Sequence, residues 1–427
     1  FSEEGESNYI LFGGTRDETF LSVTQTHYGG FVAVGYSSSD DFDMQDIFKG
    51  YNTNSNDAID AIIVKYNSLG DLELKTAFGG SRRDVFRSVT LTPDGGFVVV
   101  GDSMSNDGDM EGLSTLSGNQ YSLDAVIVKF DSLGNIEWKR GFGGSRGATF
   151  SSVKTTSDGG FIVVGNSDSQ DLDLEGIINN NSVEAIILKY DQNGNLEWIK
   201  SYGGTNHGEY FRSVEESSDG GYVAVGHTIR NTTFPIPVND FIVKYSANGE
   251  IVWEKKFDGE NQYYSITAMR NAENHDEYIV VGGSGKAPII KFDHNGNKIW
   301  EKNLPSFGIY RDVASVYNNG FVAVGYANGA LIRFFDFDGN LEWEKAFNVN
   351  YTQMLYSVVV TGDENILAVG QTPAHSMFLG HKGGYDALVV QFDLNGNSKS
   401  FNPDNGENEY NAILNEINQL NDEVDNG

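Results

Sequence analysis

Residues 86–101 read Phe-Arg-Ser-Val-Thr-Leu-Thr-Pro-Asp-Gly-Gly-Phe-Val-Val-Val-Gly, and this stretch decides the fold. It begins with an expected β-strand at Phe86–Thr90, continues through the turn Pro93–Gly96 and ends with a second strand at Phe97–Gly101. A connection this short joins antiparallel strands, because parallel strands need a crossover of about a dozen residues. The run Val98–Val100 does not alternate with polar residues, which indicates a strand buried on both faces.

Two further strands complete the repeating unit. Asp124–Phe130 is mostly apolar, and the turn Ser132–Asn135 leads from it to a polar and aromatic strand at Ile136–Phe142. Small antiparallel sheets that are buried on both faces are typical of a β-propeller, in which four-stranded sheets stack around a common axis. The alternative is a pair of β-sandwiches, whose strands should alternate apolar and polar residues. The run Val98–Val100 therefore favours the propeller.

The same unit occurs seven times along the chain. The apolar run that ends in Gly recurs at Val32–Gly35, Val98–Gly101, Ile162–Gly165, Val223–Gly226, Ile279–Gly282, Val322–Gly325 and Leu367–Gly370. The strand that follows it recurs at Asp60–Tyr66, Asp124–Phe130, Glu184–Tyr190, Asp240–Tyr245, Ala287–Phe292, Ala330–Phe335 and Asp386–Phe392. We therefore predict an all-β fold, a seven-bladed β-propeller of four-stranded antiparallel blades.

The tryptophans mark the fourth strand of the unit. All five lie four residues after the glycine of the preceding turn, at Trp138, Trp198, Trp253, Trp300 and Trp343. Leu74 holds this place in the first repeat and Ser400 holds it in the last. Such regular spacing indicates one repeated packing environment.

The chain ends are predicted to meet in the seventh blade. Ile10–Gly14 reads Ile-Leu-Phe-Gly-Gly and resembles Ala77–Gly80, where the last strand of the first repeat ends. The fourth strand of the last repeat, near Asn397–Phe401, is weak and lacks tryptophan. We therefore expect the N-terminal segment to complete or reinforce the seventh blade, which would remove an unpaired sheet edge.

These boundaries place the propeller at residues 9–401 and an acidic tail at residues 402–427. The tail is expected to be a short helix, or a linker towards another domain or an anchor, because its apolar residues follow helical spacing. These residues are Tyr410, Ile413, Leu414, Ile417 and Leu420.

Composition narrows the possible partners. The chain has 60 Asp and Glu against 29 Lys and Arg, a formal net charge of −31. This charge repels phosphate backbones and anionic lipids, so nucleic acid and direct membrane insertion are not expected. The lack of cysteine excludes disulfides, thiol catalysis and zinc–thiolate sites. The chain begins at Phe1 without a basic and apolar leader, and we expect a mature or engineered fragment whose targeting segment is absent.

The loop between the second and third strands is long in repeats one to three and short in repeat six. Binding residues concentrate in such loops, although neutral variation in length is the alternative. The three long loops carry paired carboxylates at Asp41 and Asp43, Asp107 and Asp109, and Asp171 and Asp173. Carboxylates in alternation, with Ser and Asn nearby, are the oxygen ligands that calcium prefers, so we predict calcium at these six residues. Local turn capping by the same side chains is the simpler alternative.

The loop between successive repeats lies at the same end of the ring and carries Arg16, Arg82 and Arg146, which we predict as ligand-binding residues. They could orient a carboxylate or sulfate, or pair with the neighbouring acidic loops. Repeat four departs from this pattern with Asn206 and with an apolar loop at Phe234–Pro237, which is a possible contact surface.

No catalytic motif withstands inspection. Gly143–Gly147 matches a nucleophile elbow by its letters, but an elbow connects a strand to a helix and this segment connects two strands. Gly282–Lys286 lacks the first glycine of a phosphate-binding loop. His375 and His381 share one loop, which is weak support for zinc. An enzyme is therefore less expected than a binding module; the alternative is a carboxylate-dependent hydrolase active on glycosides or polysaccharides.

Several phrases resemble a known group of proteins. They are Ser157-Asp158-Gly159-Gly160-Phe161, Ser105-Asn106-Asp107-Gly108-Asp109, Gly383-Gly384-Tyr385-Asp386-Ala387 and Phe142-Gly143-Gly144-Ser145. They resemble the secreted bacterial repeat propellers of sorting-signal or lipoprotein-anchored surface proteins, over roughly residues 11–400. The turn and tryptophan phrase also resembles the tryptophan-docking repeats of quinoprotein propellers.

The resemblance implies an extracellular or cell-surface location and a role in binding or adhesion. We therefore predict a bacterial binding module, stabilised by calcium, that recognises a glycan or an extracellular protein through its long loops.

Overall fold

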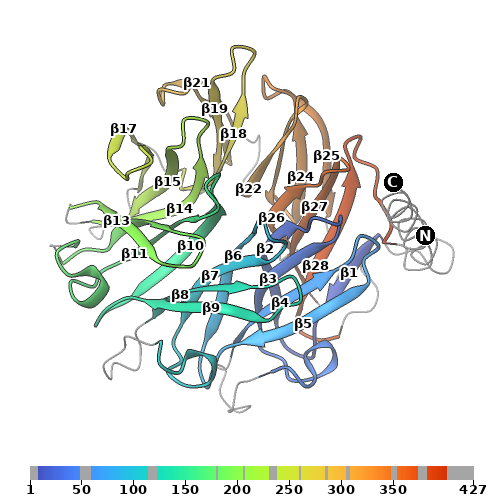
Figure 1. The fold of residues 1–427 in the computed structure, drawn as a ribbon. Helices are drawn as coiled ribbons and strands as arrows, with labels where there is room; N and C mark the ends of the chain where they lie inside the picture. The colour runs from blue at the N-terminus through green and yellow to red at the C-terminus, as the bar shows by residue number, and fades with distance from the viewer. Residues whose placement is uncertain are drawn as a thin grey trace, which may run out of the picture.

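The chain folds into seven antiparallel sheets of four strands each, as the sequence predicts. The computed structural model describes residues 8–48, 59–113, 123–178, 181–204, 207–229, 238–258, 261–283, 287–303, 308–347, 353–373 and 382–401. Within each sheet, consecutive strands pair with their neighbours. Figure 1 shows the seven sheets arranged around a common centre, which is the propeller and not a pair of sandwiches.

The first three blades follow one another along the chain. Blade 1 consists of β2 (Glu18–Gln25), β3 (Phe31–Ser37), β4 (Asp60–Tyr66) and β5 (Leu72–Phe78). Blade 2 consists of β6 (Asp84–Leu91), β7 (Phe97–Ser103), β8 (Asp124–Phe130) and β9 (Ile136–Phe142). Blade 3 consists of β10 (Ala148–Thr155), β11 (Phe161–Ser167), β12 (Glu184–Tyr190) and β13 (Leu196–Tyr202).

The remaining four blades repeat this order. Blade 4 consists of β14 (Gly208–Glu216), β15 (Tyr222–Ile229), β16 (Val238–Tyr245) and β17 (Ile251–Asp258). Blade 5 consists of β18 (Tyr263–Arg270), β19 (Asp276–Gly282), β20 (Pro288–Phe292) and β21 (Lys298–Asn303). Blade 6 consists of β22 (Ile309–Val316), β23 (Gly320–Tyr326), β24 (Ala330–Phe335) and β25 (Leu341–Phe347). Blade 7 consists of β26 (Met354–Val360), β27 (Asn365–Pro373), β28 (Tyr385–Asp393) and β1 (Tyr9–Phe12).

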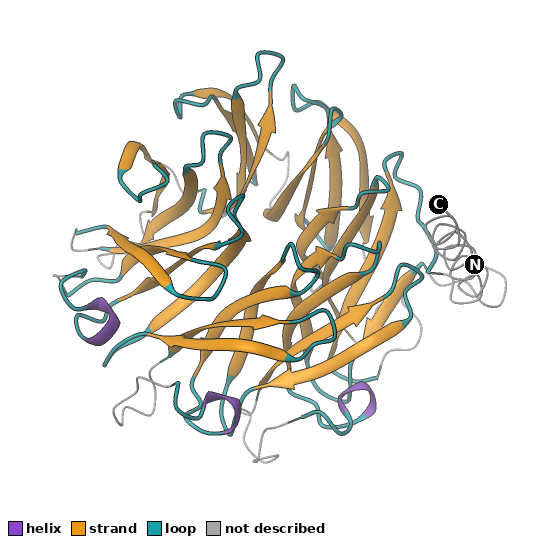
Figure 2. Cartoon of the chain, viewed as in Figure 1, coloured by secondary structure: helices purple, strands orange, loops and turns teal. Residues whose placement is uncertain are grey.

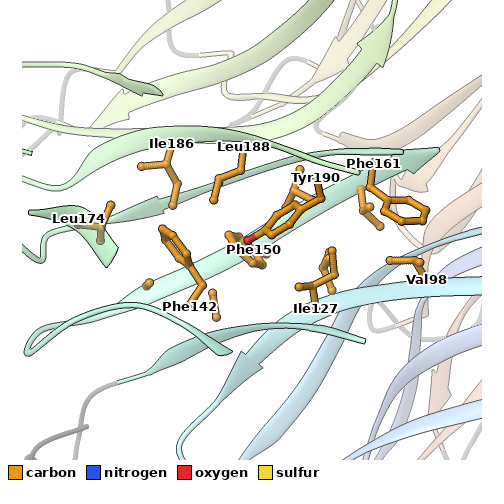
Figure 3. Close-up of a cluster of buried hydrophobic side chains, with 14 of the residues drawn as sticks. Val98, Ile127, Phe142, Phe150, Phe161, Leu174, Ile186, Leu188 and Tyr190 are labelled. Carbon is orange, nitrogen blue, oxygen red and sulfur yellow. The ribbon is translucent and has the colours of Figure 1, made fainter. Parts of the chain in front are cut away.

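The hydrophobic core lies between the blades. The described residues form seven clusters of buried side chains, and each cluster joins two adjacent sheets. Figure 3 shows the cluster between blades 2 and 3, where Ile127 and Phe142 meet Phe150 and Leu188. Burial on both faces of each sheet explains why the second and third strands are almost continuously apolar.

The ring closes through the N-terminal strand. β1 pairs with β28, with Phe12 opposite Ala387, and so supplies the fourth strand of blade 7. Phe12 is 2% exposed and belongs to the cluster between blades 7 and 1. The predicted role of the N-terminal segment is therefore confirmed.

The tryptophans link neighbouring blades at the outer strands. The ring of Trp138 lies against Gly194 in the turn of the next blade, and Trp343 lies against Gly396 in the same way. Leu74 takes this place on Gly134, as the sequence predicts. In the last repeat the prediction of Ser400 is wrong, because Phe401 is the residue that covers Gly70. The segment after β28 forms an isolated bridge between Ser398 and Phe392, and β1 provides the outer strand of this blade.

The two ends of the ring differ. One end, the turn face, carries the short turns after the first and third strands of each blade. The other end, the long-loop face, carries the loops after the second strand and between blades. Three one-turn helices lie in these loops at the periphery (Figure 2): η1 (Phe42–Met44), η2 (Gly108–Met110) and η3 (Leu172–Leu174).

The described residues contain no helix that is long and apolar enough to cross a membrane. The predicted tail at residues 402–427 lies outside the described residues.

Candidate site at the mouth of the central channel

The innermost strand of each blade carries a β-bulge at the same repeat position. The register shifts between Phe86 and Ser88 in β6, for example, and at the matching place in the other six innermost strands. A bulge leaves one residue unpaired and redirects its side chain. The seven bulge residues are Leu21, Arg87, Ser151, Arg212, Tyr264, Arg311 and Tyr356.

All seven bulge residues line one central cavity of about 350 Å³. The bulges lie in the first half of each innermost strand, which starts at the long-loop face. We call this ring of bulge residues the channel mouth. Its arginines and tyrosines come from blades 2, 4, 5, 6 and 7, so residues far apart in the sequence meet at one opening.

Arg87 is neutralised by a carboxylate. It pairs with Asp102 on the adjacent β7, and Arg83 donates to the second oxygen of the same carboxylate at 2.6 Å. Asp102 is fully buried, so a carboxylate at this depth is stable only because the two guanidinium groups surround it.

Arg212 has a different environment. Its guanidinium lies 5.4 Å from the ring centre of Tyr210, and its Nη2 lies 3.5 Å from Nε2 of His227. Its Nε is buried and has no hydrogen-bond partner among the described residues. Burial lowers the pKa of Arg212, and the positive charges of Arg87 and Arg311 lower it further. The positive charges of the other two arginines of the mouth therefore repel Arg212.

His227 adds no charge to the channel mouth at neutral pH. Burial lowers the pKa of His227 to about 3, and the charge of Arg212 contributes to that shift. The imidazole is therefore neutral at neutral pH. The positive charge of the mouth therefore comes from its arginines.

Arg311 is held between two aromatic rings. Its guanidinium lies 4.7 Å from the ring centre of Tyr264 and 5.9 Å from that of Tyr356. Burial raises the pKa of Tyr356, the positive charge of Arg311 lowers it, and the nearby phenols of Tyr36 and Tyr385 raise it further. Stacking of this kind fixes the orientation of a guanidinium and leaves its N–H edges available.

Deeper in the channel, side chains bind the edges of the innermost strands. Ser22 accepts a hydrogen bond from the backbone N–H of Val89 at 3.2 Å, and Ser88 accepts one from Val153 at 3.2 Å. Asp312 replaces the serine in blade 6 and accepts from Val358 at 2.9 Å. These bonds occupy edge amides that would otherwise be free to pair with another strand.

The acidic loops bind the backbone of the loops between blades. In blade 2, Asp109 accepts from the N–H of Gly79 at 3.1 Å and Asp107 accepts from that of Ser81 at 2.8 Å. Ser105 accepts from Arg82 at 3.1 Å. The same arrangement occurs in blade 1 with Asp43, Asp41 and Ser39, and in blade 3 with Asp173, Asp171 and Ser169.

The six predicted calcium ligands therefore serve as acceptors for backbone amides that lie two residues apart, each pair at its own blade junction. Hydrophobic residues of the same loops, Met44, Met110 and Leu174, are fully buried and fix the loop to the core. The carbonyl of Asp43 already accepts from Nζ of Lys75 at 2.8 Å. Across the described ranges, no three His, Cys, Asp or Glu side chains are grouped so that they could hold a metal ion. Calcium at these residues stays a prediction.

The predicted arginines Arg16, Arg82 and Arg146 lie on the long-loop face, outside the channel mouth. Their backbone N–H groups donate to Ser39, Ser105 and Ser169. Hydrogen bonds from Ser145 lower the pKa of Asp171, and the nearby charge of Arg146 also lowers it. Arg146 thus lies beside an acidic loop. A ligand-binding role for the three arginines stays a prediction.

The discounted catalytic motifs give no site. Gly143–Gly147 connects β9 to β10, two strands, as the sequence indicates. Ser284–Lys286, His375, His381, Asn206 and Phe234–Pro237 lie outside the described residues. Glu215 and Asp312 are the two carboxylates that line the described channel; Glu215 pairs with Lys154 at 3.1 Å, and Asp312 accepts hydrogen bonds from Ser265 and Ser357. The hydrolase alternative stays a prediction.

The comparison with known proteins supports the fold and gives no function. No protein-family model matches the chain, and no curated protein matches it. Raptor from Chaetomium thermophilum is structurally similar, with a TM-score of 0.54 and 9% identity over 90% of this chain and 29% of Raptor. Sqt1 from Chaetomium thermophilum has a TM-score of 0.50 and 13% identity over 91% of this chain and 99% of Sqt1.

A protein of unknown function from Bacteroides caccae has a TM-score of 0.42 and 12% identity over 67% of this chain and 91% of its own. The sheet topology, with the two Chaetomium structures beside it, identifies the chain as a seven-bladed β-propeller.

Proposed function

We propose that this propeller is an extracellular or cell-surface binding module that recognises a glycan or a protein through its long-loop face. The contact site is the channel mouth. The observation that carries the proposal is the convergence of Arg87, Arg212 and Arg311 with Tyr264 and Tyr356 at one opening. In a chain of net charge −31, three arginines grouped in one cavity mark a local region suited to binding.

The scaffold suits recognition because the mouth residues stand on rigid strands. Each comes from a bulge in an innermost strand whose flanking residues are buried, such as Phe211 and Val214 around Arg212. A site of this kind is preorganised, so little conformational entropy is lost when a ligand binds.

The resemblance of repeats one to three to secreted bacterial propellers supports the location. Calcium in the acidic loops would add stability to the same face, beside the amide contacts of Asp107 and Asp109. The proposal of a glycan or protein ligand does not depend on calcium.

The experiment is a binding screen of surface glycans and extracellular matrix proteins against the purified chain. Each ligand found is then titrated against the variant Arg212→Gln with Tyr356→Ala, and against Arg270→Gln as a control. Arg270 ends β18 at the turn face and is exposed, with a weak contact of 3.9 Å to Asp276.

We expect the mouth variant to lose affinity by about tenfold or more, while Arg270→Gln binds like the parent. Circular dichroism and melting curves confirm that both variants fold. Equal affinity of the parent and the mouth variant for every ligand contradicts the proposal. Steady turnover of a bound glycan by the parent would instead support the hydrolase.

A further inference from the structure

Two arginines at the channel mouth have no carboxylate counter-ion among the described residues. Asp102 is shared by Arg83 and Arg87. In the described part of the chain, Arg212 and Arg311 contact aromatic rings and one neutral histidine, and neither forms an ion pair. Both guanidinium groups are half-buried, a position in which a charge without a partner is destabilising, and this chain has acidic residues in large excess.

The contacts of Arg212 and Arg311 leave hydrogen-bond donors for a ligand. A guanidinium presents five N–H donors in a planar fork that matches carboxylate and sulfate oxygens. Arg311 stacks between Tyr264 and Tyr356, and Arg212 lies over Tyr210, so ring faces cover the flat sides of both groups. Anions fit the edges that remain.

The wall of the channel disfavours an extended peptide. Peptides often bind by adding a strand to a free sheet edge. Here the edge amides of Val89, Val153, Ile266 and Val358 already donate to side chains of the neighbouring blade. Hydroxyl groups and phenols line the cavity instead, and these bind polyols well.

The geometry also limits how a ligand enters. The cavity of about 350 Å³ is walled by all seven innermost strands, a size in the range of small-molecule sites. A long polymer cannot lie across a ring of this kind and reach its interior, whereas the end of a chain can enter along the axis.

We propose that the channel mouth binds the terminal residue of an acidic glycan, with the anionic group of that sugar held by Arg212 and Arg311 and its ring against the tyrosines. This inference rests on the proposed function, because it names the ligand class of the same site. The anion can be a carboxylate or a sulfate ester.

The test uses isothermal titration with four probes: trigalacturonate, a sulfated galactose oligomer, the neutral galactose trimer and a poly-glutamate peptide. We expect at least one acidic sugar to bind and the neutral trimer to bind about tenfold more weakly or not at all. Arg212→Gln and Arg311→Gln should each weaken acidic-sugar binding by about tenfold. Arg270→Gln, an exposed change at the turn face, should leave it unchanged.

End-on binding has a separate readout in the stoichiometry. Long and short oligogalacturonates should each bind one protein per chain end, whatever their length. Several proteins per long chain would contradict end-on recognition. Equal binding of neutral and acidic sugars, or a preference for poly-glutamate, would overturn the proposed ligand class. If the mouth variants still lose binding in that case, the proposed function is upheld.

Discussion

The hydroxyl of Ser265 donates a hydrogen bond of 2.6 Å to the carboxylate of Asp312, across the boundary between blades 5 and 6. Ser357 of blade 7 donates to the other oxygen at 2.9 Å, and so does the backbone N–H of Val358. One carboxylate thus joins three blades at the channel wall.

Removal of this carboxylate should destabilise the ring. We expect Asp312→Ala to lower the free energy of unfolding by about 2–4 kcal/mol, because hydrogen bonds to a charged acceptor are lost and their donors stay buried. Asp338→Ala, at an exposed turn position, is the control and should change it by less than about 0.5 kcal/mol. Urea unfolding measures both. A similar small change in the two variants would contradict the role of Asp312.

The contact between tryptophan and glycine can be tested with a matched pair of glycines. Gly194 and Gly220 both have positive φ angles, 74° and 77°. A Cβ on Gly194 would lie 2.8 Å from Cδ2 of Trp138, whereas a Cβ on Gly220 would have nothing within 4 Å. Each alanine variant loses about 1 kcal/mol from backbone strain. We expect Gly194→Ala to lower the free energy of unfolding by about 1–3 kcal/mol more than Gly220→Ala does, because the added methyl group overpacks the contact with Trp138. Equal losses in the two variants would show that the ring of Trp138 does not pack on Gly194.

The buried carboxyl of Asp240 predicts that the stability of the protein depends on pH. Burial raises the pKa of Asp240 to about 7, although backbone N–H groups of Asn261, Tyr263 and Gln262 partly oppose this. One of its oxygens has no hydrogen-bond partner among the described residues. In the folded chain the carboxyl of Asp240 stays protonated up to about pH 7, whereas in the unfolded chain it loses its proton near pH 4. The free energy of unfolding therefore falls as the pH rises from about 4 to about 7.

We therefore expect Asp240→Asn to stabilise the protein relative to the parent, by an amount that grows from about pH 4 to about pH 7 and reaches the order of a few kcal/mol. Urea unfolding at several pH values measures the difference. Asp338→Asn should show no such trend. A constant difference between Asp240→Asn and the parent at every pH would contradict a protonated Asp240 in the folded chain.

Variants of the acidic loops can distinguish the two roles proposed for their carboxylates, calcium binding and the capping of backbone amides. Asn keeps one carbonyl oxygen, so Asp171→Asn can still accept from the backbone N–H of Ser145 and should lower the melting temperature less than Asp171→Ala does. If calcium binds here as predicted, a chelator lowers the melting temperature of the parent and Asp171→Asn reduces that response. A melting temperature that ignores chelator rules calcium out as the stabilising ligand and leaves the amide contacts.

The repeats made the fold predictable, since the apolar runs and the tryptophans mark the same places in successive blades. The chain closure was predictable for the same reason, because Ile10–Gly14 repeats the end of an outer strand. The residue that packs on Gly70 at the closure was not predictable, because an offset of one residue moves this contact from Ser400 to Phe401.

The channel mouth was missed because its residues vary from repeat to repeat. One signal was present: the buried residues of the innermost strands, such as Phe86 and Val89, are three apart and not two or four. Such spacing indicates a bulge, and the residue after the aromatic is then the one that the bulge redirects. Reading that position in each repeat gives Arg87, Arg212 and Arg311 directly.

The position of a bound ligand tests the central claim most directly. Crystals soaked with trigalacturonate should show a sugar in the channel mouth, with its carboxylate within hydrogen-bond distance of Arg212 and Arg311. Sugar density confined to the outer loops near Arg16, Arg82 and Arg146, with the mouth unchanged, would contradict the account.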